Sequence, residues 1–313
     1  MSSGDHGTVI DTKKGSEQTR RRQLISPEYL PAIRVFAATI LLIVIMKVIN
    51  PSFGSFAQLA AIAVTAIFLV VASFGQGLVI LLGGMDLSLG VVIGIGGMMI
   101  AELTRGSNDA LMYAIPLTLL ACLCIGIVSG IGVAIGKVPP FIVTLASSIT
   151  FYGIALGFTA GNSQQPVAPA LQGFMSGSWL GVPYPVFFLV LFAIVAWLFQ
   201  NRSAYGRKLY ALGSSPDAAL ILGLPITALT VSVYAISGLC AGLTGILLAG
   251  YSSSATIDMG DALLMPSIAA VVIGGARVTG GSGIYLGTLG GALFLSTLST
   301  VIAALSLSQG LRY

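Results

Sequence analysis

Apolar residues gather in nine long runs along this chain, and polar residues are largely confined to the stretches between them. A helix needs about twenty apolar residues to cross a hydrocarbon core of roughly 30 Å. The runs are continuously apolar and do not alternate, so they predict helices and not the strands of a barrel. The pattern predicts an all-α, polytopic membrane protein in which some spans are short or broken by glycine. The expected spans are 33–49, 57–82, 89–103, 111–135, 140–160, 184–199, 226–249, 263–275 and 284–305.

Composition supports a membrane protein and removes several classes of function. Hydrophobic residues make up 56% of the chain and charged residues 8%, whereas soluble domains carry about a quarter charged residues. The sequence has no phosphate-binding loop, no zinc-protease motif and no Cys/His cluster, and its one histidine, His6, lies near the N-terminus. We therefore expect no ATPase or other catalytic site, no metal, no cofactor and no nucleic-acid partner. Cys122, Cys124 and Cys240 lie in apolar runs and are predicted to be small core residues.

Basic residues in the polar segments predict the orientation in the membrane. Residues 1–30 are polar and basic with no signal-peptide cleavage site, so they predict a cytosolic tail ahead of a transmembrane domain at 31–313. Residues 161–183 contain no Lys or Arg and are placed outside, whereas Arg202 and Arg277 are placed in the cytosol. On this count the ninth span ends outside.

One polar, basic segment, residues 201–225, interrupts the apolar sequence after the sixth span. Within it, a Pro-Asp start followed by an apolar stretch predicts a short amphipathic helix, which Gly223 and Pro225 would close. A solvated loop with basic anchors is the simpler interpretation, but a short helix at the cytosolic surface is a shape that a motor domain can grip. Together with the family resemblance given below, this shape leads us to favour contact with an ATPase. The residues assigned to that contact are Arg207, Gly213, Ser215, Pro216, Asp217, Ala218, Ala219 and Gly223.

Glycines recur at four-residue spacing in several predicted spans. This spacing puts them on one face of a helix, where a neighbouring helix can approach closely. Two interpretations stay open, namely tight packing within one subunit, or a surface between subunits or moving parts. The glycines concerned are Gly126/Gly130, Gly132/Gly136, Gly238/Gly242 and Gly283/Gly287/Gly291.

Two segments, 79–90 and 270–281, interrupt the apolar pattern in a similar way. Each contains an apolar strip, a Gly-Gly pair, one charged residue and a hydroxyl residue before a glycine opens the next apolar run. Paired interruptions in two halves of a transporter are typical of internal pseudosymmetry and of broken helices near the transport pathway.

Asp86 is the most informative single residue, because a carboxylate in or beside an apolar span is costly and usually has a purpose. With Ser88 it would cap the next helix by accepting from the free backbone N–H groups at Leu89 and Gly90. One alternative is a hydrogen-bonding role at the substrate pathway or its gate, to which we assign both Asp86 and Ser88. Another is a proton-coupling site, but no second buried carboxylate or histidine offers a relay.

The predicted span at 140–160 carries several hydroxyl side chains. Prolines set the start of this helix, and its hydroxyls are interleaved with aromatic rings, a combination suited to a polyol that needs hydrogen bonds and an aromatic surface. Ser and Thr in membrane helices equally often bond only to backbone or to a neighbouring helix. The pathway residues assigned here are Phe141, Thr144, Ser147, Ser148 and Tyr152.

Several motifs occur in an order that identifies a family. Gly83-Gly-Met-Asp-Leu-Ser-Leu-Gly90 is followed by Pro139-Pro-Phe-Ile-Val-Thr-Leu145, Gly206-Arg-Lys-Leu-Tyr-Ala-Leu-Gly213, Ile268-Ala-Ala-Val-Val-Ile-Gly-Gly275 and Gly280-Gly-Ser-Gly283. The first is similar to the GGIDLSVG signature of the ribose-type (monosaccharide) permeases of bacterial ABC importers, and the likeness covers nearly the whole chain. Nucleoside and branched-chain amino acid permeases are related, but their corresponding segments differ from this motif.

The resemblance implies an ABC importer permease fold with ten spans, so that the total is nine to ten, in the bacterial inner membrane. It implies a coupling helix at Ser215–Leu222, and a solute path between two permease chains, which are either two copies or two paralogues. It also implies two cytosolic ABC ATPase subunits and an external sugar-binding protein. Many relatives carry a Glu-Leu-Asp-Ala pattern where this chain has Leu264-Met-Pro-Ser267, which would mark a different subgroup, substrate or partner arrangement.

We therefore expect the permease subunit of an ATP-driven importer of a monosaccharide, such as ribose or another pentose or hexose. Import of a related polar solute, such as a polyol or a furanose signal, is the first alternative. An ion-coupled secondary transporter and a purely structural membrane scaffold are the others, and the sparse intramembrane charge disfavours ion coupling.

Overall fold

The computed structural model describes residues 29–159 and 166–310, so the predicted cytosolic tail lies almost wholly outside the described residues. Within those ranges the regular elements are helices apart from one short hairpin, β1 (Ser178–Trp179) with β2 (Val182–Pro183). The helices are α1 (Leu30–Ile49), α2 (Phe56–Leu81), α3 (Leu89–Thr104), α4 (Leu111–Ala134), α5 (Pro140–Thr159), α6 (Pro169–Ser176), α7 (Tyr184–Trp197), α8 (Ala204–Ser214), α9 (Pro216–Ile221), α10 (Ile226–Ser252), α11 (Asp261–Ile273) and α12 (Tyr285–Gly310). A π-helical turn, η2 (Leu198–Arg202), continues α7, and a 3₁₀ turn, η3 (Ile257–Gly260), precedes α11.

All nine apolar runs form helices, but they differ in length. Among the described residues, seven helices are long and apolar enough to span a membrane: α1, α2, α4, α5, α7 with η2, α10 and α12. The other two are α3, with 16 residues, and α11, with 13. At 1.5 Å per residue these two reach only about 24 and 20 Å. Both adjoin the glycine-rich interruptions, so the chain is a multi-pass membrane protein with broken helices, as predicted.

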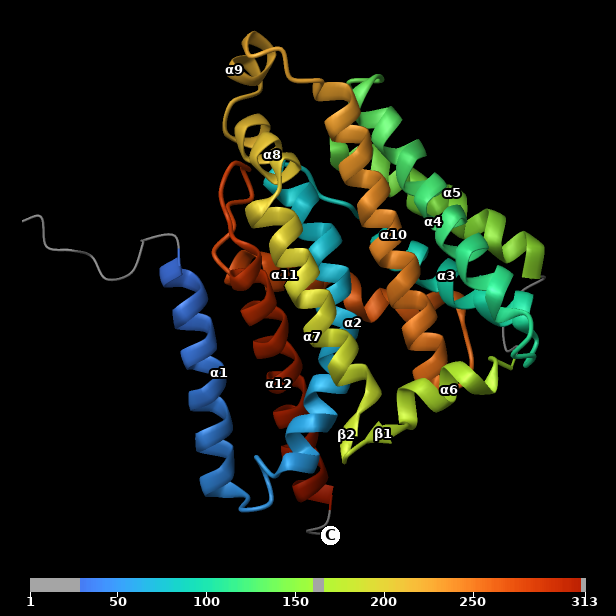
Figure 1. The fold of residues 1–313 in the computed structure, drawn as a ribbon, viewed down its shortest axis with the longest axis vertical. Helices are drawn as coiled ribbons and strands as arrows, with labels where there is room; N and C mark the ends of the chain where they lie inside the picture. Colours follow the sequence, from blue (N-terminus) through green and yellow to red (C-terminus); the bar gives the residue numbers. More distant parts are fainter. Residues whose placement is uncertain (1–28, 160–165, 311–313) are drawn as a thin grey trace, which may run out of the picture.

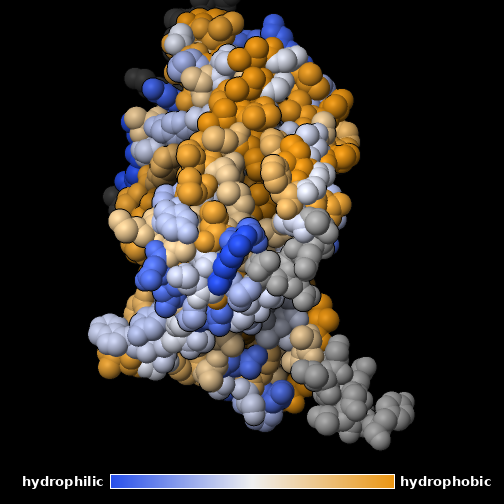
Figure 2. Space-filling model, turned by 90° about the vertical axis from the view of Figure 1, so that its right-hand side faces the viewer, coloured by the Kyte–Doolittle hydropathy of each residue, from blue (hydrophilic) through white to orange (hydrophobic). Residues whose placement is uncertain are grey.

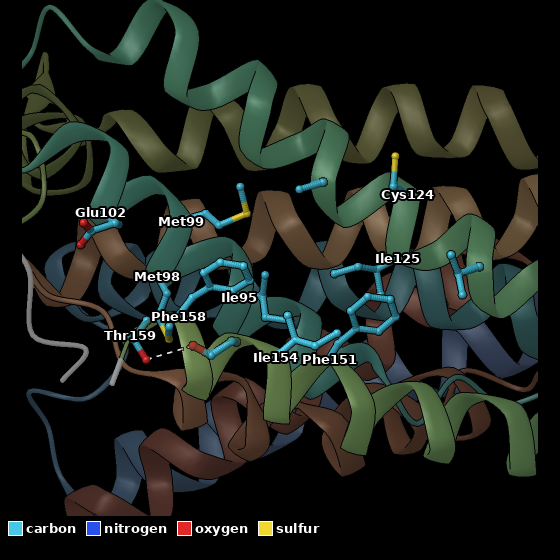
Figure 3. A pocket seen from close by; sticks show the side chains of 13 residues that line it. Ile95, Met98, Met99, Glu102, Cys124, Ile125, Phe151, Ile154, Phe158 and Thr159 are labelled. Atoms are coloured by element: carbon cyan, nitrogen blue, oxygen red, sulfur yellow. Dashed lines mark hydrogen bonds between the residues drawn. The ribbon is translucent and has the colours of Figure 1, made fainter. Parts of the chain in front are cut away.

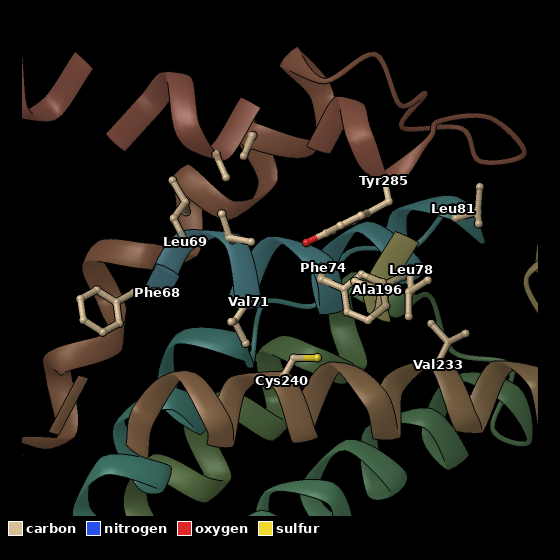
Figure 4. Close-up of a cluster of buried hydrophobic side chains, with 14 of the residues drawn as sticks. Phe68, Leu69, Val71, Phe74, Leu78, Leu81, Ala196, Val233, Cys240 and Tyr285 are labelled. Atoms are coloured by element: carbon tan, nitrogen blue, oxygen red, sulfur yellow. The ribbon is translucent and has the colours of Figure 1, made fainter. Parts of the chain in front are cut away.

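Helices α2 and α10 form the centre of the bundle, with α1 and α12 on one side and α3, α4 and α5 on the other (Figure 1). Over half of the span is buried in α2 and α10, whereas only 17% is buried in α5. In the core, Phe74 of α2 packs edge-on against Tyr285 of α12, with ring centroids 5.3 Å apart, and against Phe192 of α7 at 5.7 Å. Figure 4 shows Phe74 and Tyr285 together with Val233 and Cys240 of α10. Helix α5 is therefore peripheral in a single chain.

The glycine pairs bring α4 and α10 into backbone contact. A Cβ atom at Gly126 would lie 2.2 Å from the carbonyl oxygen of Tyr234, and one at Gly238 would lie 2.3 Å from that of Cys122. Two glycines of α12 face the end of α11 in the same way. No side chain fits at such distances, so the interpretation as packing within one subunit is confirmed for these glycines.

The outside of the bundle is apolar. Large side chains of α1, α4, α5 and α7 are exposed, among them Val48, Met112 and Phe158, and hydrophobic residues cover the upper part of the face seen in Figure 2, with polar residues below. Such a surface suits contact with lipid. Cys122 and Cys240 are buried as predicted, but Cys124 is exposed on α4, so the prediction of a core position is wrong for that residue.

Helices α8 and α9 lie at one end of the bundle, and α6 with the β1–β2 hairpin lies at the other (Figure 1). The loop that contains Arg277 returns to the α8 end, where the Ser214 hydroxyl donates to the Gly281 carbonyl oxygen at 3.3 Å. The two basic segments that the charge pattern places in the cytosol therefore share one end of the molecule.

Candidate functional site

Asp86 lies in the break between α2 and α3 and is only 2% exposed. Its Oδ1 accepts hydrogen bonds from the amide and the hydroxyl of Ser88, at 3.0 and 2.5 Å, and its Oδ2 accepts from the hydroxyl of Ser237 on α10 at 2.7 Å. With its amide oriented so that both of its polar atoms are satisfied, the Gln76 side chain of α2 donates to the Asp86 carbonyl oxygen at 3.1 Å and accepts from the Asp86 amide at 3.2 Å. A buried carboxylate is costly unless it is hydrogen-bonded, and here α10 and the loop itself supply the donors, while α2 holds the backbone of Asp86.

The predicted cap of α3 is wrong in its detail. Ser88 already has helical backbone angles, and its side chain makes no capping hydrogen bond. Asp86 accepts from the amide of Ser88, one residue before the N–H groups at Leu89 and Gly90, and so closes an Asx turn. Both side chains are buried. They fix the entry into α3 and do not lie on an exposed face in this conformation.

Two of the hydroxyls predicted on α5 make contacts inside the bundle. Thr144 accepts from the Leu87 amide at 3.1 Å and donates to the Pro140 carbonyl oxygen at 2.9 Å, which ties α5 to the Asp86 loop. The hydroxyls of Ser147 and Ser129 bond at 3.0 Å between α5 and α4. Thr144 and Ser147 therefore match the alternative in which such hydroxyls bond to backbone or to neighbouring helices.

The other three pathway candidates on α5 lie nearer its outer side. Phe141 is exposed, and Ser148 and Tyr152 are half-buried. Steps of seven and four residues bring them onto one stripe of the helix. The Tyr152 hydroxyl interacts with the carboxylate of Asp258 in η3, and Asp261 lies close by.

The sequence pattern does not single out Asp258 and Asp261. Both are exposed, although their segment packs along α3: a Cβ at Gly90 would lie 3.4 Å from Asp261 Oδ1, and one at Gly94 would lie 1.8 Å from the Ile257 carbonyl oxygen. Carboxylates at membrane depth face a water-filled cavity or a partner. The one feature of the sequence that could have drawn attention to them is their position, two acidic residues just ahead of the short apolar run at 263–275. We call Ser148, Tyr152, Asp258 and Asp261 the polar face.

A cavity of about 940 Å³ opens between α3, α4 and α5 (Figure 3). Phe151, Ile154 and Phe158 of α5 face Ile95 and Met99 of α3 across it. Its polar lining is confined to Glu102 and Thr159 at one end and to Cys124. Hydroxyls that leave water need hydrogen-bond partners, so this cavity suits an apolar chain and not a sugar.

The two interrupted segments end their helices with the same geometry. After α2, Gly83 has φ of +78°, its amide donates to the Ile80 carbonyl oxygen, and the Gly84 amide donates to that of Val79. After α11, Gly275 has φ of +92°. Its amide donates to the Val272 carbonyl oxygen, and the Ala276 amide donates to that of Val271. Both are Schellman motifs, which need glycine because φ is positive. The predicted similarity of the two interruptions is confirmed at this level.

The predicted short helix in 201–225 forms as α9, at the far end of the molecule (Figure 1). The Ser215 hydroxyl accepts from the Ala218 amide at 3.2 Å and caps it, and Pro216 takes the first position. A third Schellman turn closes it at Gly223, where φ is +70°. Helix α9 is therefore stabilised at both ends by local bonds.

The exposed side chains of α9 are partly apolar. Leu220, Ile221 and Leu222 are 67, 86 and 71% exposed, whereas Ala219 is buried against the bundle. Three successive exposed large apolar residues at an end of the bundle form a candidate surface for contact with another molecule. The sequence pattern predicted the helix and its caps, but the choice of contact residues missed these three.

The remaining residues assigned to ATPase contact differ in position. Asp217 and Ala218 are exposed on α9. Arg207 is exposed on α8 and donates to the Arg202 carbonyl oxygen at 3.1 Å. Gly213 is packed into the bundle, since a Cβ there would lie 1.9 Å from the Leu81 carbonyl oxygen.

A tyrosine holds the start of α8 to α10. The hydroxyls of Tyr205 and Ser232 share a hydrogen bond of 2.6 Å. Burial raises the pKa of the Tyr205 hydroxyl above its ordinary value near 10, although the bond to Ser232 opposes the shift. The hydroxyl is therefore neutral at any pH at which transport would be measured.

Comparison with known proteins shows which family this chain resembles. Residues 58–312 match the family described as branched-chain amino acid transport system / permease component. The ribose import permease protein of Bacillus subtilis is 31% identical over 93% of this chain and 91% of its own, and that of Haemophilus influenzae is 33% identical over 88% and 86%. The autoinducer 2 import system permease protein of Photorhabdus laumondii is 32% identical over 67% of this chain and 65% of its own. No solved structure matches this chain.

Proposed function

This chain belongs to the branched-chain amino acid transport system / permease component family, and we propose that it is the membrane subunit of an ATP-driven importer of a monosaccharide. The main observation in support of this proposal is the structure of helix α9. It is capped at both ends and lies at an end of the molecule, and it exposes Leu220, Ile221 and Leu222. In this proposal a cytosolic ABC ATPase covers these three side chains, and ATP is hydrolysed in that partner.

The polar face supports a path for a hydroxyl-rich solute along α5. Sugar hydroxyls donate to carboxylates, and tyrosine and serine hydroxyls both donate and accept. A single chain leaves Asp258 and Asp261 exposed beside membrane-spanning helices, which favours a second permease chain across a water-filled path. An external sugar-binding protein would deliver the solute at the α6 end, and α8 and α9 would face the cytosol of a bacterium, with the protein in its inner membrane.

A furanose signal molecule is the second candidate substrate. The likeness to an autoinducer 2 import system permease favours it. Such a molecule shares the hydroxyl chemistry of a pentose, so the same polar face would serve both. Uptake of each labelled solute, measured separately with ATP, shows which of the two the transporter moves.

The first experiment is purification of the full chain from detergent-solubilised native membranes, followed by mass identification of the proteins that accompany it. We expect an ATPase with a phosphate-binding loop, and we expect Ile221→Glu to lose it because a charge replaces an apolar contact. Ser148→Ala, away from α9, is the matched control and should retain it.

Transport in vesicles completes this test. Uptake of radiolabelled ribose should require ATP and survive collapse of the proton gradient. A chain that purifies alone, with uptake that ignores ATP and stops when the gradient collapses, would replace this proposal with an ion-coupled transporter. Unchanged uptake in the Ile221→Glu variant would remove α9 from the mechanism.

A further inference from the structure

Three segments that are distant in the sequence meet in backbone contact at the end of α8. The Gly281 amide donates to the Leu81 carbonyl oxygen at 2.9 Å. A Cβ at Gly213 would lie 1.9 Å from that same oxygen and 2.8 Å from the Gly281 nitrogen. We call residues 81–84, 213–214 and 279–283 the glycine junction. Only glycine at 213 allows the end of α8 to touch both of the other segments.

The junction also joins the two helix breaks to each other. A Cβ at Gly83 would lie 3.1 Å from the Thr279 carbonyl oxygen, and one at Gly280 would lie 2.8 Å from the Gly83 nitrogen. Gly83 and Gly280 both have positive φ, so their backbones are set by the turns and not by side-chain packing. Close-packed backbone has little room to slide, and a displacement of one break is passed to the other.

Side chains tie α7 and α8 to the same loop. The Tyr210 hydroxyl of α8 donates to the Gly283 carbonyl oxygen at 2.6 Å, and the Gln200 amide of η2 donates to the Tyr210 oxygen at 3.1 Å. The Ser214 hydroxyl reaches the Gly281 carbonyl oxygen at 3.3 Å. Gln200 lies in a π-helical turn, a feature often found at functional positions in helices.

Helix α9 is attached to this junction without a flexible linker. Ser215 ends α8 and also caps the start of α9. A force on α9 therefore acts at Gly213 and Ser214, the two residues that directly precede Ser215. From there it reaches the end of α2, the loop that holds Asp86, and the loop that leads into α12.

We propose that the glycine junction transmits motion of α9 to both helix breaks at once, with Tyr210 as a positioning residue that keeps α8 and the loop before α12 together. This inference rests on the proposed function, because it needs an ATPase that moves α9. Rotation of α8 alone would separate the Tyr210 hydroxyl from Gly283, so a loss of this bond weakens the coupling and leaves the ATPase contact at α9 intact.

The test compares two tyrosines of α8 in the complete transporter reconstituted in vesicles. Tyr210→Phe removes the hydroxyl that faces Gly283, and Tyr205→Phe removes the one that faces Ser232. The measurements are uptake of radiolabelled ribose and hydrolysis of ATP. Tyr210→Phe loses the bond to Gly283 and the bond from Gln200, but Gln200 can still donate to the Gly283 carbonyl oxygen. The net loss is therefore about one hydrogen bond, and we expect unchanged ATP hydrolysis and a fall in ribose moved per ATP by about threefold to tenfold. For Tyr205→Phe we expect the wild-type ratio.

A second pair of variants uses the backbone contact. Gly213→Ala places a methyl group against the Leu81 carbonyl oxygen and should lower the same ratio, whereas Gly153→Ala on α5 meets no atom within 4 Å and should not. If Gly213→Ala does not fold, the tyrosine pair decides alone. An unchanged ratio in Tyr210→Phe, or an equal fall in Tyr205→Phe, overturns the inference. A wild-type complex that takes up neither ribose nor another monosaccharide with ATP refutes the proposed monosaccharide import instead.

Discussion

Replacement of the Asp86 carboxylate tests whether this group holds the break between α2 and α3. Asp86→Ala removes three hydrogen bonds, two with Ser88 and one with Ser237, and leaves their donors buried. A hydrogen bond to a charged group contributes about 1.5–3 kcal/mol. The plain sum for three such bonds overestimates the loss of stability, because water can enter the space left by the side chain and the loop can relax. We expect a loss of about 3–5 kcal/mol in the free energy of unfolding.

Asp86→Asn is the matched control. It keeps one oxygen for Ser88, and its amide can donate to the Ser237 hydroxyl oxygen, so the three contacts survive in altered form. We expect a loss of about 1 kcal/mol, near that of one ordinary hydrogen bond. In detergent, at about 2–4 °C per kcal/mol, Asp86→Ala should melt about 6–20 °C below the wild type and Asp86→Asn only a few degrees below it.

The contact across to α10 can be isolated with a double-mutant cycle. Ser237→Ala alone leaves the two bonds from Ser88, so its cost should be smaller than that of Asp86→Ala. The double variant should lose less than the sum of the single losses, by about 1 kcal/mol, because both remove the same bond. Melting temperatures equal to the wild type in both Asp86 variants, with transport abolished in both, would refute this reasoning and place the carboxylate in the pathway.

Three further predictions concern packing, docking and the pathway. Gly126→Ala should lower the melting temperature by several degrees because its methyl group meets the Tyr234 carbonyl oxygen, whereas Gly153→Ala should raise it slightly or leave it unchanged; equal values would remove close packing as the reason for glycine. Ile221→Glu should reduce ATPase binding at least about tenfold in a titration of the two purified partners, with an unchanged melting temperature. Asp261→Asn should reduce ribose uptake without a change in melting temperature, since this carboxylate is exposed; unaltered uptake would remove Asp261 from the path.

Much of the site follows from local sequence, and the rest depends on contacts between distant segments. Pro216 and Gly223 mark the two ends of α9 in the sequence, because helix caps are local. The exposure of Ile221 is not local, since a run of apolar residues looks the same whether the bundle covers it or not. In the same way, Asp86 is visible as a buried acid, but its partner Ser237 lies 151 positions away.

The sequence by itself determined the class, the helices, their glycine-bearing faces and the two interruptions, because hydropathy, helix period and positive-φ turns act over a few residues. Only the tertiary structure decided which faces meet. It placed Gly126 against Tyr234, turned Thr144 and Ser147 inward, and left Asp258 and Asp261 exposed beside Tyr152. The glycine junction belongs to this second group, since its three segments contact through backbone atoms whose meeting depends on how whole helices pack.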